Sequence, residues 1–220
     1  MRLIDGKPVP ESAQEAFSRD DSALIIVDVQ NDYCCEGGHF HRVCHDLTMI
    51  REMLPNLSRL IDAACGLNVP CIYTQQTTLA GGCSDSPAWL FFKVRGGGSP
   101  HSTLLGSWGH RFVEGFEPKA EDIVVQKHRS SAFVNTSLDI VLRARGVRSV
   151  AVCGVTTEGC VESTLRHAAF LDYFVCLVED CCASDSVELH DCSVKVTRAR
   201  HPVVTGQEIV EMWSRSIRGT

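Results

Sequence analysis

Residues 23–28 read Ala-Leu-Ile-Ile-Val-Asp, a run of five apolar residues that ends at a carboxylate. Short runs of apolar or β-branched residues recur along the chain, separated by longer amphipathic stretches. The other runs lie at Cys71–Tyr73, Ile123–Val125, Ser149–Val152, Phe174–Val178 and Val203–Val204. This alternation is typical of strand–helix–strand units around a parallel sheet. The sequence therefore predicts an α/β fold in which a six-stranded, mostly parallel sheet lies between two layers of helices, a three-layer, Rossmann-like α/β/α arrangement.

The stretches between the runs have helical periodicity. In the first of them, Ile50, Leu57 and Leu60 fall on one helical face, and Pro55 is expected to kink the helix. Five helices are predicted in all: Thr48–Leu67, Leu138–Arg145, Cys160–Leu171, Glu188–Ala199 and Glu208–Trp213. Residues 75–118 lack periodicity, and we expect a long active-site loop or lid there. We expect a single domain over residues 1–220, with its core at about residues 20–210.

Composition and charge exclude several classes of protein. The 220 residues carry 21 lysines and arginines against 27 acids, a formal net charge of −6, so no basic stripe is left to neutralise the phosphates of a nucleic acid. The apolar runs fall far short of the roughly 20 residues that cross a bilayer, and no membrane partner is expected. Residues 1–8 hold no apolar signal segment, which predicts a cytoplasmic protein whose twelve cysteines are mostly buried thiols.

Three chemically distinct side chains follow predicted strands. Asp28 comes after the first strand, Lys127 after the third, and Cys160 beyond the fourth. Parallel strands end at one edge of the sheet, where ligands bind near the reversal of strand order. A helix N-terminus and a nearby lysine both lower the pKa of a thiol, so Cys160 is a candidate nucleophile, with Asp28 to take its proton. The alternatives are a turn-forming aspartate, a solvated lysine and a cysteine that only packs.

Three motifs occur in order along the chain: Asp28-Val-Gln-Asn-Asp-Tyr33, Ile-Val-Val-Gln-Lys127 and Gly154-Val-Thr-Thr-Glu-Gly-Cys-Val161. On these motifs the chain resembles the isochorismatase-like cysteine hydrolases over about residues 20–210. The resemblance implies a catalytic triad of Asp28, Lys127 and Cys160. It also implies a cis peptide bond between Val155 and Thr156, and an oxyanion hole formed by the backbone amides of Thr156 and Cys160.

Further segments are similar to the branch of the superfamily that holds ureidoacrylate and biuret hydrolases, among them Ser84-Asp-Ser-Pro-Ala-Trp89 and Cys160-Val-Glu-Ser-Thr-Leu-Arg166. This resemblance implies an amidohydrolase that cleaves the C–N bond of a small ureido or carbamoyl compound, biuret-, triuret- or ureidoacrylate-like, through an acyl-thioenzyme. A small planar substrate needs hydrogen-bonding groups and an aromatic wall. The candidates for these contacts are Gln30, Tyr33, Trp89, Arg129, Ser130, Ser131 and Glu158. Each has a structural alternative as a packing, surface or turn residue.

No metal or other cofactor is expected. Residues 73–77 read Tyr-Thr-Gln-Gln-Thr, without the Asp-x-His by which related nicotinamidases bind a divalent ion, and glutamine amides are poor ligands for zinc-like ions. A cluster of His39, His41, Cys44 and His45 is interpreted as loop surface. Alternative functions are an isochorismatase-type vinyl-ether hydrolase, a nicotinamidase-type hydrolase, and a noncatalytic binding module. Relatives suggest a homodimer or homotetramer.

Overall fold

A six-stranded sheet runs through the centre of the protein. The computed structural model describes residues 1–215, with Gly96 described by its backbone only, so residues 216–220 of the expected domain lie outside the described residues. The strands lie in the order β5-β4-β3-β6-β7-β8, and each neighbouring pair is parallel. Their bounds are β3 (Ser22–Val27), β4 (Cys71–Gln76), β5 (Ile123–Lys127), β6 (Ser149–Val155), β7 (Phe174–Ala183) and β8 (Val203–Val204). The predicted sheet is confirmed.

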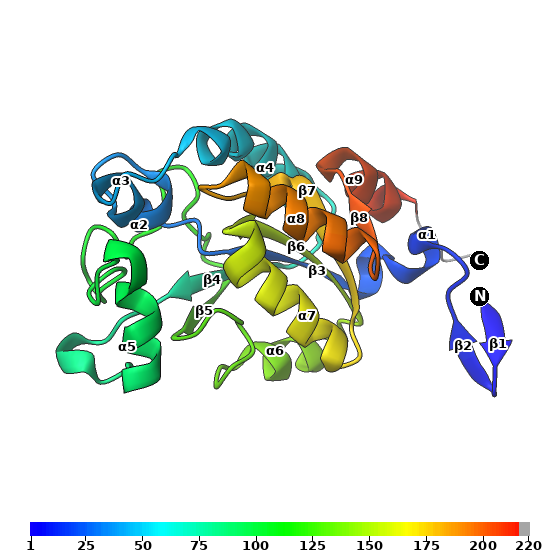
Figure 1. The fold of residues 1–220 in the computed structure, drawn as a ribbon. Helices are drawn as coiled ribbons and strands as arrows, with labels where there is room; N and C mark the ends of the chain where they lie inside the picture. Colours follow the sequence, from blue (N-terminus) through cyan, green and yellow to red (C-terminus); the bar gives the residue numbers. More distant parts are fainter. Residues whose placement is uncertain (216–220) are drawn as a thin grey trace.

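Helices cover both faces of this sheet (Figure 1). Five of them are α4 (Thr48–Gly66), α6 (Leu138–Ala144), α7 (Glu162–Phe170), α8 (Val187–Arg198) and α9 (Gly206–Ser214). Right-handed crossovers between parallel strands put α6, α7 and α8 on one face and α4, which packs against α9, on the other. All five predicted helices are present within a few residues of their expected ends. The segment expected as Cys160–Leu171 begins earlier, as a single π-helical turn at Thr157–Val161 that continues into α7.

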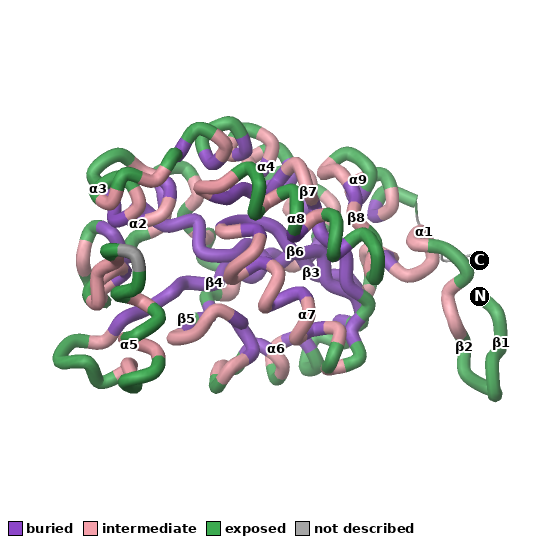
Figure 2. Tube along the Cα trace, viewed as in Figure 1, coloured by how far each residue is buried: buried purple, intermediate pink, exposed green. Residues whose placement is uncertain are grey.

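Burial is concentrated in the strands and on the inner helix faces, as Figure 2 shows. Every residue of β3 and β4 is buried. The inner face of α4 buries Ile50, Leu57 and Leu60, each worth about 1.5–3 kcal/mol when removed from water. The helix continues through Pro55. The twelve cysteines are all free thiols, and six of them are buried. The sequence analysis predicted that most would be buried, whereas half of them are.

The structure adds elements that the sequence analysis did not predict. An antiparallel hairpin, β1 (Arg2–Ile4) and β2 (Lys7–Val9), precedes the short α1 (Ala13–Ala16). Two further short helices, α2 (Asn31–Cys34) and α3 (His39–Arg42), follow β3. The segment 75–118, expected as an aperiodic loop, starts with the end of β4 and contains α5 (Pro87–Val94). Its start carries a recognisable signal, because the Ser86 side chain accepts from the Trp89 amide and Pro87 opens the helix.

Candidate active site

Asp28, Lys127 and Cys160 meet at the carboxyl edge of the sheet. Asp28 directly follows β3, Lys127 is the last residue of β5, and Cys160 lies in the π-helical turn after β6. The Lys127 Nζ atom lies 2.7 Å from Asp28 Oδ2 and 3.3 Å from Cys160 Sγ. A carboxylate, an ammonium group and a thiol that are far apart in the sequence are therefore in direct contact.

Lys127 is the centre of this group. Its side chain and that of Asp28 are both 0% exposed, and a buried charge costs several kcal/mol unless it is paired. Besides Asp28 and Cys160, the Nζ atom contacts Gln76 Oε1 at 2.8 Å and the Arg129 carbonyl at 3.0 Å. With three protons for four neighbours, Lys127 is fully engaged, and its longest contact is the one to sulfur.

Electrostatics set the protonation states. Burial raises the pKa of the Cys160 thiol to about 12, while Lys127 lowers this pKa and Asp28 raises it through its charge and a hydrogen bond. Burial opposes the charge on Lys127, but Asp28 and Cys160 outweigh burial and raise the pKa of Lys127. At neutral pH the resting sulfur is therefore a thiol, and a thiolate forms when a neighbouring base removes its proton.

Local backbone geometry fixes Asp28. Its φ of +52° lies in the left-handed region, which aspartate tolerates better than most residues, and it turns the chain sharply at the end of β3. The Thr74 hydroxyl on the neighbouring strand donates to Asp28 Oδ1 at 2.8 Å. On the other side, β6 approaches β3 so closely at Gly154 that a Cβ there would lie 2.2 Å from the Val27 carbonyl oxygen. The carboxylate is thus held by Thr74 on β4, while β6 packs directly against the backbone of the residue before it.

The peptide bond between Val155 and Thr156 is cis, as the family resemblance implies. This bond lies at the end of β6, directly before the π-helical turn that carries Cys160. Val155, Thr156, Gly159 and Cys160 line one wall of a cavity of about 260 Å³. The proposed oxyanion-hole residues therefore face the same space as the sulfur.

The other walls of the cavity come from the α2–α3 segment, the end of β4, the loop after β5, and α5 with the loop that follows it. The aromatic and aliphatic part of its lining consists of Tyr33, Phe40, Val43, Trp89, Phe92 and Val155. The uncharged polar part includes Gln76, Thr78, Ser102, Thr103, Ser130 and Thr156. Its basic part consists of His39, His45, Lys93 and Arg95. The cavity offers a planar group aromatic faces and many hydrogen-bonding partners.

Three of the predicted substrate contacts, Tyr33, Trp89 and Ser130, line this cavity. Burial raises the pKa of Tyr33 well above its ordinary value, and the proximity of Cys160 and Asp28 adds to the effect, so its phenol is neutral. Tyr33 packs on Phe40 with ring centroids 5.0 Å apart, and Trp89 stacks on Phe92 at the same separation. Both pairs of rings, one on α5 and one on the α2–α3 segment, belong to the cavity lining.

The other predicted contacts, Gln30, Arg129, Ser131 and Glu158, do not line the cavity. The first three form hydrogen bonds within the protein instead. Gln30 is completely buried, and its amide donates to the carbonyls of Gln76 and His110. The Arg129 guanidinium donates to the Ser84 carbonyl and lies 5.0 Å from the Trp89 ring centroid.

Ser131 bonds to His167, and it is the adjacent Ser130 that lines the cavity. Glu158, also outside the lining, has one buried carboxylate oxygen without a hydrogen-bond partner among the described residues. Chain position identified the correct loops, but it did not show which way each side chain points.

Gln76 is the site residue that the sequence reasoning missed. It is the register partner of Lys127 on the neighbouring strand, it accepts from Lys127 Nζ, and it lines the cavity. Gln30 holds its backbone on both sides, because Gln30 Oε1 accepts from the Gln76 amide at 2.8 Å. The available signal was its place at the end of β4, beside the strand that carries the lysine.

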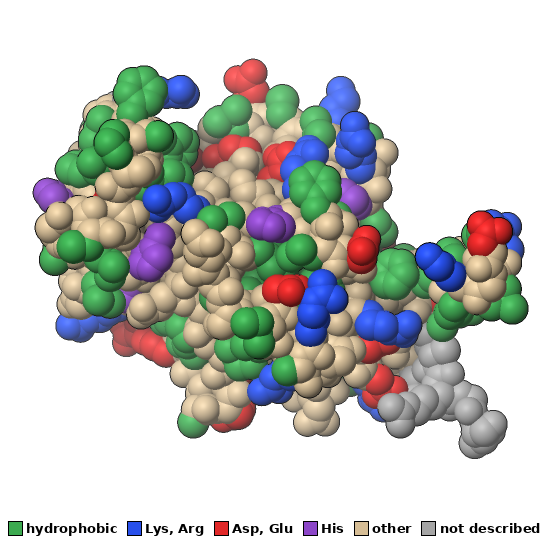
Figure 3. Space-filling model, turned by 90° about the horizontal axis from the view of Figure 1, so that it is seen from below, with side chains coloured by type: hydrophobic (Ala, Val, Ile, Leu, Met, Phe, Trp, Pro, Cys, Tyr) green, Lys and Arg blue, Asp and Glu red, His purple; other side chains and the backbone are tan. Residues whose placement is uncertain are grey.

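Among residues 1–215, no three or more His, Cys, Asp or Glu side chains are arranged to hold a metal ion. No helix in this part of the chain is long and apolar enough to span a membrane. The space-filling view shows acidic and basic side chains interspersed over the visible face (Figure 3).

Comparison with known proteins adds the family. Residues 22–208 match the model of the isochorismatase domain. The chain belongs to the isochorismatase family. Ureidoacrylate amidohydrolase RutB of Acinetobacter baylyi is 35% identical to this isochorismatase-family chain over 200 residues, 86% of this chain and 80% of that protein. RutB of Yersinia enterocolitica is 36% identical over 189 residues, 81% of this chain and 80% of the relative.

Solved structures agree in fold. A cysteine hydrolase from Pseudomonas syringae pv. phaseolicola superposes with a TM-score of 0.79 at 24% identity, over 94% of this chain and 97% of that one. The predicted isochorismatase-like fold is confirmed. This isochorismatase-family protein is an enzyme of the hydrolase class, and its amidohydrolase relatives place it among hydrolases of C–N bonds other than peptide bonds.

Proposed function

We propose that the protein is a cysteine-dependent amidohydrolase that cleaves the C–N bond of a small ureido acid through an acyl-thioenzyme. The main support for this proposal is that Lys127 Nζ contacts both Asp28 Oδ2 and Cys160 Sγ. A buried cation between a carboxylate and a thiol pairs with the carboxylate and stabilises a thiolate that forms beside it.

Acylation begins when Cys160 Sγ bonds to the carbamoyl carbon and its proton passes to Asp28. The carbonyl oxygen becomes an oxyanion at the backbone amides of Thr156 and Cys160, where each donor is worth about 2.7–4 kcal/mol of barrier. The C–N bond then breaks, and Asp28 returns the proton to the departing nitrogen, which leaves as ammonia or an amine. Water gives a proton to Asp28 and attacks the thioester carbon, and the released sulfur takes that proton back.

The charge of the cavity lining favours a substrate with an anionic end. Two cations line it, Lys93, which is paired with Asp85, and Arg95, and no Asp or Glu is found among the lining residues in the described part of the chain. Arg95 is exposed, and its guanidinium has no hydrogen bond or ion pair with the described residues. Ureidoacrylate, which the RutB relatives are named for, carries a carboxylate, whereas biuret and triuret are neutral. We therefore expect the substrate's carboxylate at Arg95.

Ammonia release across ureidoacrylate, biuret, triuret, N-carbamoyl amino acids and nicotinamide tests the substrate class. Intact-protein mass spectrometry of a quenched reaction tests the mechanism, with a covalent adduct on Cys160 expected. The variant Cys160→Ala should lose turnover and adduct, while the control Cys192→Ala, at an exposed position on α8, should keep both. Near-wild-type turnover in Cys160→Ala would refute the nucleophile, and best turnover of nicotinamide would refute the ureido substrate.

The variant Arg95→Gln tests the anionic end separately. Loss of a charge-assisted hydrogen bond is worth about 1.5–3 kcal/mol, so KM for ureidoacrylate should rise about tenfold or more. KM for a neutral ureide should stay unchanged, because that substrate has no carboxylate to lose. An equal rise for both substrates would contradict the placement of the carboxylate.

A further inference from the structure

The helix α5 covers the cavity although little apolar burial holds it there. It contributes Trp89, Phe92 and Lys93 to the cavity lining, yet none of its hydrophobic residues belongs to the buried core. Phe91 and Phe92 expose 71% and 58% of their surface. A helix of two turns is marginal on its own, so polar contacts must fix its position over the cavity.

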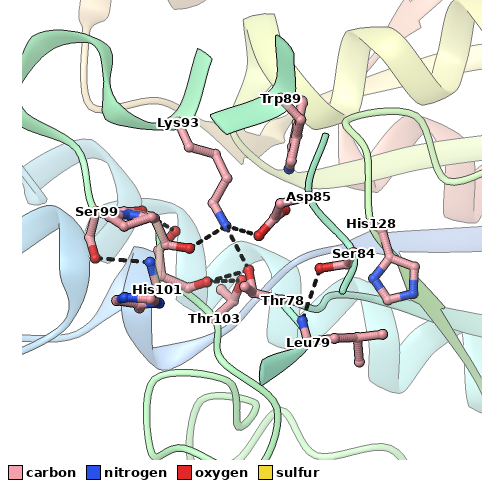
Figure 4. A network of polar contacts seen from close by, with 12 residues as sticks. Thr78, Leu79, Ser84, Asp85, Trp89, Lys93, Ser99, His101, Thr103 and His128 are labelled. Atoms are coloured by element: carbon pink, nitrogen blue, oxygen red, sulfur yellow. Dashed lines mark hydrogen bonds and ion pairs between the residues drawn. The ribbon is translucent and has the colours of Figure 1, made fainter. Parts of the chain in front are cut away.

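Lys93 makes these contacts, as Figure 4 shows. Its side chain is 7% exposed, and its Nζ atom donates to Thr78 Oγ1 at 2.9 Å and to the Pro100 carbonyl at 2.6 Å. The Nζ atom also lies 3.4 Å from Oδ2 of Asp85, whose side chain is 3% exposed. The three contacts join α5 to the end of β4, to the loop before α5 and to the loop after it.

The ion pair is a desolvated one. Burial lowers the pKa of Lys93, and Asp85 opposes this effect through its charge and a hydrogen bond. Because three acceptors occupy the three ammonium protons, Lys93 has no donor left for a substrate without releasing one of them. The role that fits this geometry is to hold the helix rather than to bind substrate.

The position of α5 determines one wall of the cavity. Trp89 lies four residues before Lys93 on the same helix, so both side chains are on one face. The Arg129 guanidinium packs against the Trp89 ring, and the Arg129 carbonyl accepts from Lys127 Nζ. A shift of α5 would therefore change both the aromatic wall and a residue that contacts the catalytic lysine.

We propose that Lys93 and Asp85 form a buried latch that holds α5 closed over Cys160, which makes Lys93 a positioning residue for the hydrolysis. The proposal rests on the proposed function for its kinetic consequences only. Opening of the latch lowers the fraction of protein that is competent to bind substrate, and the apparent affinity falls by the same factor.

Four variants test the latch: Lys93→Met, Asp85→Asn, the double variant Asp85→Asn/Lys93→Met, and the control Lys195→Met, an exposed lysine on α8. The first readout needs no substrate: the rate at which iodoacetamide alkylates Cys160, measured on the Cys160 peptide by mass spectrometry. Loss of the charge-assisted contacts should raise this rate about tenfold in each single variant. The double variant leaves no unpaired buried charge, so the logarithm of its alkylation rate should return at least halfway to the wild-type value. The control should have the wild-type rate.

The second readout is the division of the effect between KM and kcat. Lys93→Met should raise KM about tenfold for anionic and neutral ureides alike, while kcat changes by less than about threefold. Unchanged alkylation and unchanged KM in folded Lys93→Met would overturn the latch, and so would a rise in KM confined to carboxylate substrates, which would make Lys93 a substrate anchor. If Lys93→Met does not fold, Asp85→Asn and the double variant decide by the same criteria. Faster alkylation in a protein that hydrolyses no ureide would refute the proposed function and leave the latch standing.

Discussion

Replacement of Lys127 by methionine tests the buried triad as a physical unit. The change removes the ammonium group but keeps most of the side-chain volume. Asp28 then remains buried without the cation that lies 2.7 Å from it in the wild type, both side chains being 0% exposed. Loss of one partner of a buried ion pair costs about 3–5 kcal/mol. For a chain of this length, that corresponds to a fall in Tm of about 6–20 °C.

Urea unfolding, followed by circular dichroism at neutral pH, measures the free energy of unfolding of wild type, Lys127→Met and the double variant Asp28→Asn/Lys127→Met. The double variant removes both charges, so it should recover at least half of the loss. Two results would refute the reasoning: a single variant within about 1 kcal/mol of wild type, or a double variant no more stable than the single one. Either would mean that the pair carries little buried charge.

Three further changes probe neighbouring features. Gln76→Leu removes an acceptor of Lys127 and should lower the free energy of unfolding by about 1.5–3 kcal/mol, checked by the same urea titration; an unchanged midpoint would contradict the contact. Because burial raises the pKa of Cys160 to about 12, its alkylation rate should rise about tenfold per pH unit between about pH 7 and 9, and a plateau in that range would speak against a protonated resting thiol. Gly154 has a φ of +112°, and a Cβ there would lie 2.2 Å from the Val27 carbonyl oxygen, so Gly154→Ala should lower the free energy of unfolding by about 4 kcal/mol or more. The control Gly146→Ala, at a position with open space around it, should lower it by only about 1–2 kcal/mol. Equal shifts in Tm for the two variants would argue against close packing between β3 and β6.

The elements that sequence analysis predicted best are those whose local pattern and tertiary environment agree. The strand 22–27 is a continuous apolar run that is buried at every position, and the helix α4 carries an apolar periodicity that matches its buried face. The elements it missed, such as α3 and the hairpin β1–β2, are only three or four residues long, too short for periodicity to appear. The lid helix α5 had capping signals at Ser86 and Pro87 but no amphipathic repeat.

By itself, the sequence determined the parallel sheet, its helices and three candidate side chains at strand ends, because parallel strands bring their carboxyl ends to one edge whatever the loops do. It did not determine the directions of side chains in those loops. Only the folded chain decided that Ser130 rather than Ser131 lines the cavity, that Gln76 accepts from Lys127, and that Lys93 pairs with Asp85. These choices depend on contacts between segments distant in the sequence, and neighbouring residues in an irregular loop can point in opposite directions at little difference in local energy.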